Sequence, residues 1–182
     1  MKNKSGSAVF MYLTIYLTAA VAAVCLALYY FNIHKNGGVL WVGIVAFMIL
    51  YHFGLRILFG EITKRFKINY AHPWYKERCF EGRLYKLLKV GKWKRRVLTF
   101  EPDNYDLKKV SLEGLATNMS KSELDHWINE LISVFSVLFA LLWGQIAVFA
   151  TTAVLAMLCD AQFIVVQRYN RPKVLRLIER MR

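Results

Sequence analysis

Uncharged apolar stretches divide the chain into three blocks separated by polar segments. The first block, residues 8–31, contains no charged side chain in 24 positions. A helix of this length spans about 36 Å, enough to cross a hydrocarbon core of about 30 Å with some tilt. The second block, residues 38–59, is interrupted only by His52 and Arg56, and Arg56 lies near its end, where its guanidinium can extend to the interface. Both blocks therefore predict membrane-spanning helices.

The third block, residues 131–166, is too long for a single span. Only Asp160 is ionisable within it, and one straight helix of this length would measure about 54 Å. Two antiparallel spans fit a bilayer better, with a break between Gly144 and Thr152, where glycine, glutamine and two threonines weaken the helical pattern. We therefore predict an all-α integral membrane protein that forms a single membrane domain over residues 1–182. Its four spans cover approximately residues 8–31, 38–59, 128–148 and 150–167.

The link between the first two blocks, residues 32–38, is short and rich in turn formers, so these two spans are expected to form a hairpin. A cleaved secretory signal is the alternative for the first block, because Lys2 and Lys4 precede it and residues 20–22 read Ala-Val-Ala. The apolar stretch continues past that sequence to Phe31, which favours a retained span.

The basic residues indicate the orientation of the spans. Of 25 Lys and Arg, 15 lie between residues 61 and 126 and six follow Val166, whereas the two predicted hairpin tips carry only Lys35. The positive-inside rule then places both termini and the 61–126 segment in the cytoplasm. The net charge of +13 is explained by anionic lipid headgroups, at about 1 kcal/mol per charge near the surface, more simply than by nucleic acid.

Several chemistries are excluded by the motifs that the sequence lacks. Cys25 and Cys159 lie in predicted spans and Cys79 lies in the basic segment, so neither a disulfide nor a zinc site is expected. There is no P-loop, no dinucleotide-binding glycine pattern and no internal repeat. We therefore expect no metal and no resident cofactor.

The cytoplasmic segment, residues 61–126, is polar enough to meet soluble substrates and is attached to the membrane at both ends. Between residues 75 and 97 it mixes aromatic and aliphatic side chains with many Lys and Arg, which is typical of an interfacial amphipathic helix or helix pair. Gly91 is the expected break. A passive membrane-surface anchor would have the same composition.

Two histidines are candidates for a general base, because an imidazole titrates close to neutral pH. His72 precedes Pro73, which favours an extended backbone at His72 and ends any preceding helix near the interface. A hydrogen-bonded interfacial histidine is the alternative.

His126 lies at the start of the third block, with Ser120 or Ser122 as the expected N-cap. Glu130 follows one turn later on the same helix face, where a carboxylate could orient the imidazole and stabilise its protonated form. Trp127 beside it could equally belong to an aromatic belt.

The segment after the last apolar stretch contains Arg168, Asn170 and Arg171. The two guanidiniums are close enough in sequence to bind a phosphate or a carboxylate together, and the amide adds neutral hydrogen bonds. An ordinary basic stop-transfer cluster is the alternative.

Several short motifs, spread over roughly residues 60–180, together carry a resemblance to a known protein family. They are His72-Pro73-Trp74-Tyr75, Glu81, Tyr85 to Leu88, Val90 with Lys92-Trp93-Lys94, Glu123 to Trp127, and Gln167 to Arg176. Together they resemble the glycosyl-diaponeurosporenoate acyltransferase family of staphyloxanthin biosynthesis. Phe80 stands where the family has Trp, Val97-Leu98 replaces Leu-Pro, and the acidic stretch 101–106 leaves the acceptor open.

The resemblance implies a multi-pass enzyme of the bacterial cell membrane. It would transfer a fatty acyl group, with acyl-CoA the expected donor, to a hydroxyl of a glycolipid or related lipid acceptor. His72 or His126 would deprotonate this hydroxyl, with Glu81 or Glu130 orienting the base. The expected substrate-binding residues are Trp74, Lys92, Trp93, Lys94, Trp127, Arg168, Asn170 and Arg171.

Two other classes of function compete with this interpretation. A non-catalytic membrane adaptor would use the basic segment to bind lipid or a partner, and it predicts that His72 and His126 tolerate substitution. A small transporter or channel subunit has little support, because few polar groups lie inside the predicted spans. Those groups are His52, Gln145 and Asp160.

Overall fold

The computed structural model describes residues 6–97, 99 and 101–181, and contains helices and no strand within those ranges. Four helical stretches are long and apolar enough to cross a membrane. Both observations confirm the prediction of an all-α membrane protein with about four spans. Lys2, Lys4 and Leu98, which entered the sequence interpretation, lie outside the described residues. The chain divides into two compact units, the first ending at Phe59 and the second beginning at Gly60.

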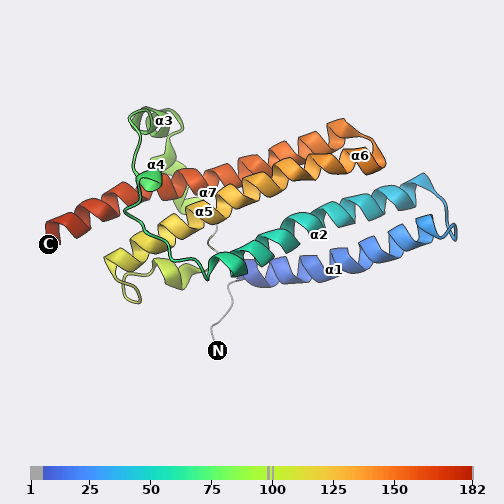
Figure 1. The fold of residues 1–182 in the computed structure, drawn as a ribbon, viewed down its shortest axis with the longest axis horizontal. Helices are drawn as coiled ribbons and strands as arrows, with labels where there is room; N and C mark the ends of the chain where they lie inside the picture. The colour runs from blue at the N-terminus through green and yellow to red at the C-terminus, as the bar shows by residue number, and fades with distance from the viewer. Residues whose placement is uncertain (1–5, 98, 100, 182) are drawn as a thin grey trace. The chain divides into compact units, whose positions relative to one another are not determined.

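The first unit is a helical hairpin made by α1 (Gly6–Tyr30) and by α2 (Gly37–Thr63) as far as Phe59, as Figure 1 shows. Asn36 caps the second helix, because its side-chain oxygen accepts a hydrogen bond from Gly38 N at 2.7 Å. At Gly43 the two helices approach so closely that a Cβ there would lie 2.9 Å from the Leu26 side chain. A small residue at such a contact is typical of helix packing in membranes. The predicted hairpin is therefore confirmed.

The second unit begins with a segment of short helices, where the sequence predicted an amphipathic helix or helix pair. They are η1 (Pro73–Tyr75), α3 (Glu81–Leu87), α4 (Val90–Trp93), η2 (Lys94–Arg96) and η3 (Pro102–Tyr105). Lys89 lies between α3 and α4, and its backbone is in the left-handed region, with φ of 50°. The predicted break at Gly91 is wrong, because Gly91 lies inside α4, where a Cβ would be 3.4 Å from Tyr169 Oη. The interfacial position of this segment stays a prediction.

The rest of the second unit is a long hairpin in which α5 (Leu112–Ser136) lies beside α7 (Ile146–Met181), as Figure 1 shows. Short helices η4 (Val137–Phe139) and α6 (Ala140–Trp143) complete the first arm. The break predicted between Gly144 and Thr152 occurs at its early end, between Trp143 and Ile146. Gly144 has φ of 70° and ψ of −152°, a combination that essentially only glycine adopts.

Both arms of this hairpin extend beyond the predicted spans. The N-cap predicted at Ser120 or Ser122 is wrong, because α5 begins at Leu112 and Ser111 Oγ accepts a hydrogen bond from Gly114 N at 3.1 Å. The extra turns bury an apolar face against the end of α7, which in turn continues past residue 167 to Met181. The buried contacts in this cluster are made by Leu115, Ala116, Met119, Val174 and Ile178.

Large apolar side chains remain exposed along the half of the second hairpin that ends in the turn at Gly144. Phe135, Leu141 and Leu155 are each more than half exposed. A soluble protein rarely leaves such a continuous apolar surface uncovered, whereas lipid tails would cover it. The surface therefore agrees with a membrane-spanning hairpin.

The turn at Gly144 provides a test of this hairpin. Gly144→Ala should lower the free energy of unfolding by about 1–3 kcal/mol, because alanine is strained at this φ and ψ. Thermal unfolding in detergent would measure the change. Gly60→Ala is the matched control, since a Cβ at Gly60 in α2 has no atom within 4 Å and alanine favours a helix. Equal stability of both variants would contradict the assigned turn.

Candidate functional site

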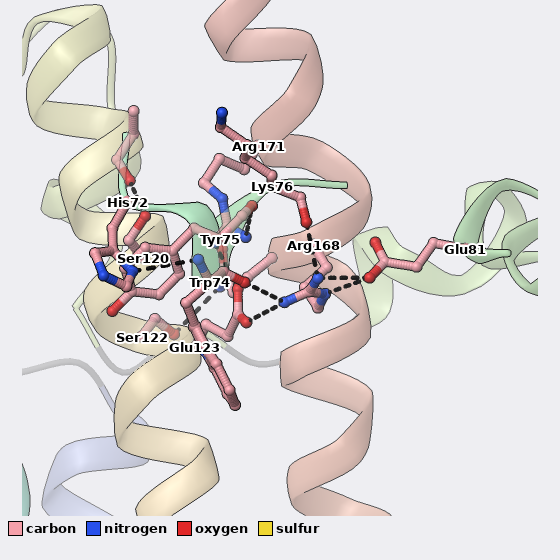
Figure 2. A network of polar contacts seen from close by, with 12 residues as sticks. His72, Trp74, Tyr75, Lys76, Glu81, Ser120, Ser122, Glu123, Arg168 and Arg171 are labelled. Atoms are coloured by element: carbon pink, nitrogen blue, oxygen red, sulfur yellow. Dashed lines mark hydrogen bonds and ion pairs between the residues drawn. The ribbon is translucent and has the colours of Figure 1, made fainter. Parts of the chain in front are cut away.

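A buried group of charges joins α5 and α7 and is drawn in Figure 2. Glu123 of α5 is completely buried, and its two carboxylate oxygens accept hydrogen bonds from two arginines of α7. Arg168 Nη1 lies 2.6 Å from Oε1, and Arg171 Nη1 lies 2.5 Å from Oε2. Because a buried carboxylate is stable only when it is paired, Glu123 requires both helices in this register.

A second carboxylate, Glu81 of α3, completes the group. Arg168 donates to Glu81 Oε1 through Nε at 2.8 Å and through Nη2 at 2.5 Å. Tyr85 Oη donates to the other oxygen of Glu81 at 2.7 Å. Burial is the largest cause that raises the pKa of the Tyr85 phenol, and the hydrogen bond to the negative Glu81 raises it further. Glu81, Glu123, Arg168 and Arg171, named the charge network below, balance two positive charges with two negative ones.

The charge network also holds the segment that follows His72. Arg171 Nη2 donates to the carbonyl of Tyr75 at 2.6 Å, and its guanidinium lies 4.9 Å from the centre of the Tyr75 ring. Arg168 donates to the carbonyls of Trp74 at 3.3 Å and Lys76 at 3.1 Å. Burial raises the pKa of the Tyr75 phenol, and the charge of Glu123 raises it further. The two arginines of α7 therefore hold the three consecutive backbone carbonyls of residues 74–76, as Figure 2 shows.

This arrangement changes the interpretation of three residues selected from the sequence. Arg168 and Arg171, expected to bind an anionic substrate, bind carboxylates of the protein itself, and Arg171 is only 1% exposed. Glu81, expected to orient a histidine, bonds to Arg168 and Tyr85 instead. Glu123, at the centre of the network, was not selected, although it begins the family-like stretch that contains His126.

His126 forms a second polar contact between α5 and α7. Its Nδ1 lies 2.8 Å from Asp160 Oδ1, and Asn129 Nδ2 donates to the same oxygen at 3.1 Å. The imidazole stacks on Phe163, with ring centres 4.3 Å apart and planes 6° from parallel. Asp160, one of the few polar groups inside the predicted spans, thus bonds to His126. Glu130, the expected orienting group, is buried one turn after His126.

The tautomer of His126 follows from this contact. A carboxylate only accepts hydrogen bonds, so a neutral imidazole bonded to ionised Asp160 carries its proton on Nδ1. Its Nε2 then has a lone pair that can accept a proton. The His126 side chain is 19% exposed, so it is only partly covered by the protein. His126 therefore has the geometry of an oriented general base.

In His72 the two ring nitrogens have the opposite roles. Its Nδ1 accepts a hydrogen bond from Trp74 N at 3.2 Å and so caps η1. A neutral imidazole that accepts at Nδ1 carries its proton on Nε2, which can then donate but not accept. His72 lines a shallow cleft of about 370 Å³ together with Trp74 and Leu124.

The structure does not bring the two histidines onto one face. Leu124, which lines the cleft of His72, precedes His126 by two residues on α5. Two residues correspond to a rotation of about 200° around an α-helix. His72 and His126 therefore face different sides of α5, and among the described residues a carboxylate pairs with His126 but not with His72.

The remaining sequence-selected residues form two contacts. Trp74 and Trp127 meet edge to face with ring centres 6.3 Å apart, and both stay about half exposed. Lys94 Nζ donates to Asn170 Oδ1 at 2.7 Å, a pair that sequence proximity could not reveal. Burial, with a smaller contribution from the charge of Lys173, lowers the pKa of Lys94.

Lys92 and Trp93 are the last two residues of α4. Trp93 Nε1 donates to the carbonyl of Leu88 at 2.9 Å, which closes the turn between α3 and α4. Lys92 lines a cleft beside α7. Within residues 6–97, 99 and 101–181, no three His, Cys, Asp or Glu side chains gather in a way that could hold a metal ion.

Comparison with known proteins gives one match. The model of the family described as glycosyl-4,4'-diaponeurosporenoate acyltransferase matches residues 71–180, which is more than half of the chain. This range contains the charge network and both histidines of interest. No curated protein and no solved structure matches the chain.

Removing the charge of Glu123 tests the structural role of the charge network. Glu123→Gln should lower the free energy of unfolding by about 3–5 kcal/mol, because the buried Arg171 and the largely buried Arg168 lose a shared counter-charge. Denaturant titration in mixed micelles would measure the loss. Glu179→Gln removes an exposed carboxylate from the same hairpin and should change stability by less than about 0.5 kcal/mol. A similarly small effect of Glu123→Gln would contradict the assigned role.

Proposed function

Because the chain belongs to the glycosyl-4,4'-diaponeurosporenoate acyltransferase family, we propose that it transfers a fatty acyl group from acyl-CoA to a hydroxyl of a glycolipid or related lipid. The family name supports acyl transfer in carotenoid glycolipid modification. The donor, the acceptor and the location at the cytoplasmic face of a bacterial membrane are part of this proposal. His126 is the proposed base.

The single observation that carries the proposal is the contact between His126 and Asp160. Asp160 holds the imidazole in the tautomer whose Nε2 can accept a proton, and it stabilises the imidazolium formed when that proton arrives. Asn129 fixes the carboxylate by donating to the same oxygen, and Phe163 holds the plane of the ring. The ring is therefore oriented before substrate binds.

The proposed reaction needs only this base and the two substrates. Nε2 of His126 takes the proton of the acceptor hydroxyl as its oxygen attacks the thioester carbonyl carbon. The tetrahedral intermediate then collapses, the carbon–sulfur bond breaks, and the imidazolium returns the proton to the departing thiolate. The products are the ester and the free thiol, and His126 returns to its starting state.

The position of His126 along the hairpin suits a lipid acceptor. Asp160 lies 15 residues after Gln145, or about 23 Å from the hairpin turn along α7. Arg168 lies eight residues further, about 35 Å from the turn, beyond a hydrocarbon core of about 30 Å. If the turn lies at one interface, the base lies just inside the other. A lipid hydroxyl can then arrive laterally while a polar donor arrives from water.

His72 is assigned a different part in this proposal. Its imidazole caps the turn before Trp74, and its Nε2–H can donate to a polar group in the neighbouring cleft. We therefore expect His72 to affect acceptor binding rather than proton removal. This separates the two histidines, which the sequence left as equivalent candidates.

Acyl transfer by purified protein in lipid nanodiscs, with labelled acyl-CoA and candidate glycolipids, tests the proposal. His126→Gln should lower kcat by about 10²–10⁴-fold, because the general base is lost. Asp160→Asn should also lower kcat, because an amide that donates to Nδ1 of His126 reverses its tautomer. His72→Gln should mainly raise KM for the acceptor.

His34→Gln is the matched control, because His34 is exposed in the turn between α1 and α2. It should leave transfer unchanged. Folded His126→Gln protein with wild-type kcat would exclude His126 as the base. Absence of transfer with every acceptor would instead favour a membrane adaptor.

A further inference from the structure

A second cleft, named the basic cleft here, lies between α3, α4 and α7 and has a volume of about 430 Å³. This volume falls within the range of small-molecule sites. Glu77 is the one acidic residue in its lining. Five cationic side chains line it: Lys86, Lys89, Lys92, Lys173 and Arg176.

The five cations of the basic cleft form no ion pair with a carboxylate among the described residues. In the part of the chain that the structure describes, ion pairs with carboxylates form at Arg168 and Arg171 but at none of these five residues. Lys173 Nζ instead lies 3.6 Å from the centre of the Tyr169 ring. Its charge also contributes to the lowered pKa of nearby Lys94. The basic cleft therefore has a concentrated positive potential that favours an anion.

The walls of the basic cleft leave room for a ligand close to the backbone. Gly82 and Gly91 lie in its lining without side chains to obstruct it. Tyr85 and Tyr169 meet edge to face, with ring centres 5.4 Å apart, and Tyr85 is held by its bond to Glu81. Lys89 adopts its left-handed conformation at this edge, which is uncommon for a residue with a side chain. The cleft is thus attached to the charge network through Tyr85.

We propose that the basic cleft binds adjacent phosphate groups and that these belong to the nucleotide end of the thioester donor. Lysine ammonium groups bind phosphate oxygens as compact charges with strong hydrogen bonds. Along α7, Tyr169 lies nine and Lys173 thirteen residues after Asp160, or about 14 and 20 Å. The donor needs an extended arm between its phosphates and its thioester, and coenzyme A has one. This inference rests on the proposed function, because it assigns the polar end of the same donor.

The experiment measures binding without turnover, using coenzyme A and inorganic pyrophosphate as probes. Full-length protein is placed in phosphatidylcholine nanodiscs and titrated by calorimetry. Lys89→Ala/Lys92→Ala should weaken coenzyme A binding by about tenfold or more, because two charge-assisted contacts are lost. Arg65→Ala/Lys108→Ala is the control, because it removes the same charge from exposed residues outside the basic cleft. It should change affinity by less than about twofold.

A lipid headgroup is the other source of phosphate, and a second arm with phosphatidylglycerol in the discs distinguishes it. The inference expects the lysine pair to control coenzyme A binding in both lipids. It is overturned if the double variant binds coenzyme A normally, or if the lysine pair affects only binding of phosphatidylglycerol.

Failure of the inference and failure of the proposed function give different results. His126→Gln should bind coenzyme A like the wild type, because His126 lies outside the basic cleft. Lysine-dependent binding without any acyl transfer would contradict the proposed function and leave the phosphate site supported. Transfer by the wild type, with coenzyme A binding insensitive to the lysine pair, would support the function and overturn the inference.

Discussion

The pairing of one buried carboxylate with two guanidiniums, one buried and one largely buried, is the constraint on which the second unit depends. Glu123 is completely buried and lies between Arg168 and Arg171. Each of these charges would be costly to bury alone, so the group is stable only when α5, α7 and α3 occupy one relative position. The second carboxylate, Glu81, extends the same requirement to α3. Apolar contacts in a lipid bilayer specify helix register weakly by comparison, since lipid tails are as apolar as leucine.

The register fixed by these charges has a chemical consequence nearer the hairpin turn. His126 lies on α5 and Asp160 on α7, so their 2.8 Å contact exists only while the two helices keep this alignment. The same arginines bind the carbonyls of residues 74–76, and Tyr85 joins Glu81 to the wall of the basic cleft. One polar group thereby connects the proposed base with the proposed donor site. An enzyme that transfers a group from a water-soluble donor to a lipid acceptor must hold its donor site and its base at a fixed separation, because one substrate arrives from water and the other from the bilayer.

The sequence predicted the elements of this fold better than its contacts. Four apolar stretches and the break at Gly144 could be predicted because helix length is limited by bilayer thickness. The true start of α5 at Leu112 could not, because residues 112–122 have few strongly apolar positions and their partner face lies on the distant end of α7. Local spacing also suggested Glu130 as the partner of His126, whereas the bonded carboxylate, Asp160, lies 34 residues away.

The same limit explains why the partners of the two arginines could not be predicted from the sequence. Two arginines with no acidic residue nearby in sequence resemble a binding site for an external anion. Their actual partners, Glu123 and Glu81, lie 45 and 87 residues from Arg168. Such pairs depend on tertiary packing, which no helical periodicity encodes. The basic cleft shows the opposite case, because its lysines keep no carboxylate partner among the described residues after folding.

The central claim is that Asp160 holds His126 with its Nε2 ready to accept a proton. Nitrogen-15 NMR of histidine-labelled protein in lipid nanodiscs measures this directly, at a pH where the ring is neutral. The signals of His126 are assigned by their loss in His126→Gln. The account predicts a ring protonated on Nδ1 and unprotonated on Nε2. A neutral ring protonated on Nε2 alone would contradict it.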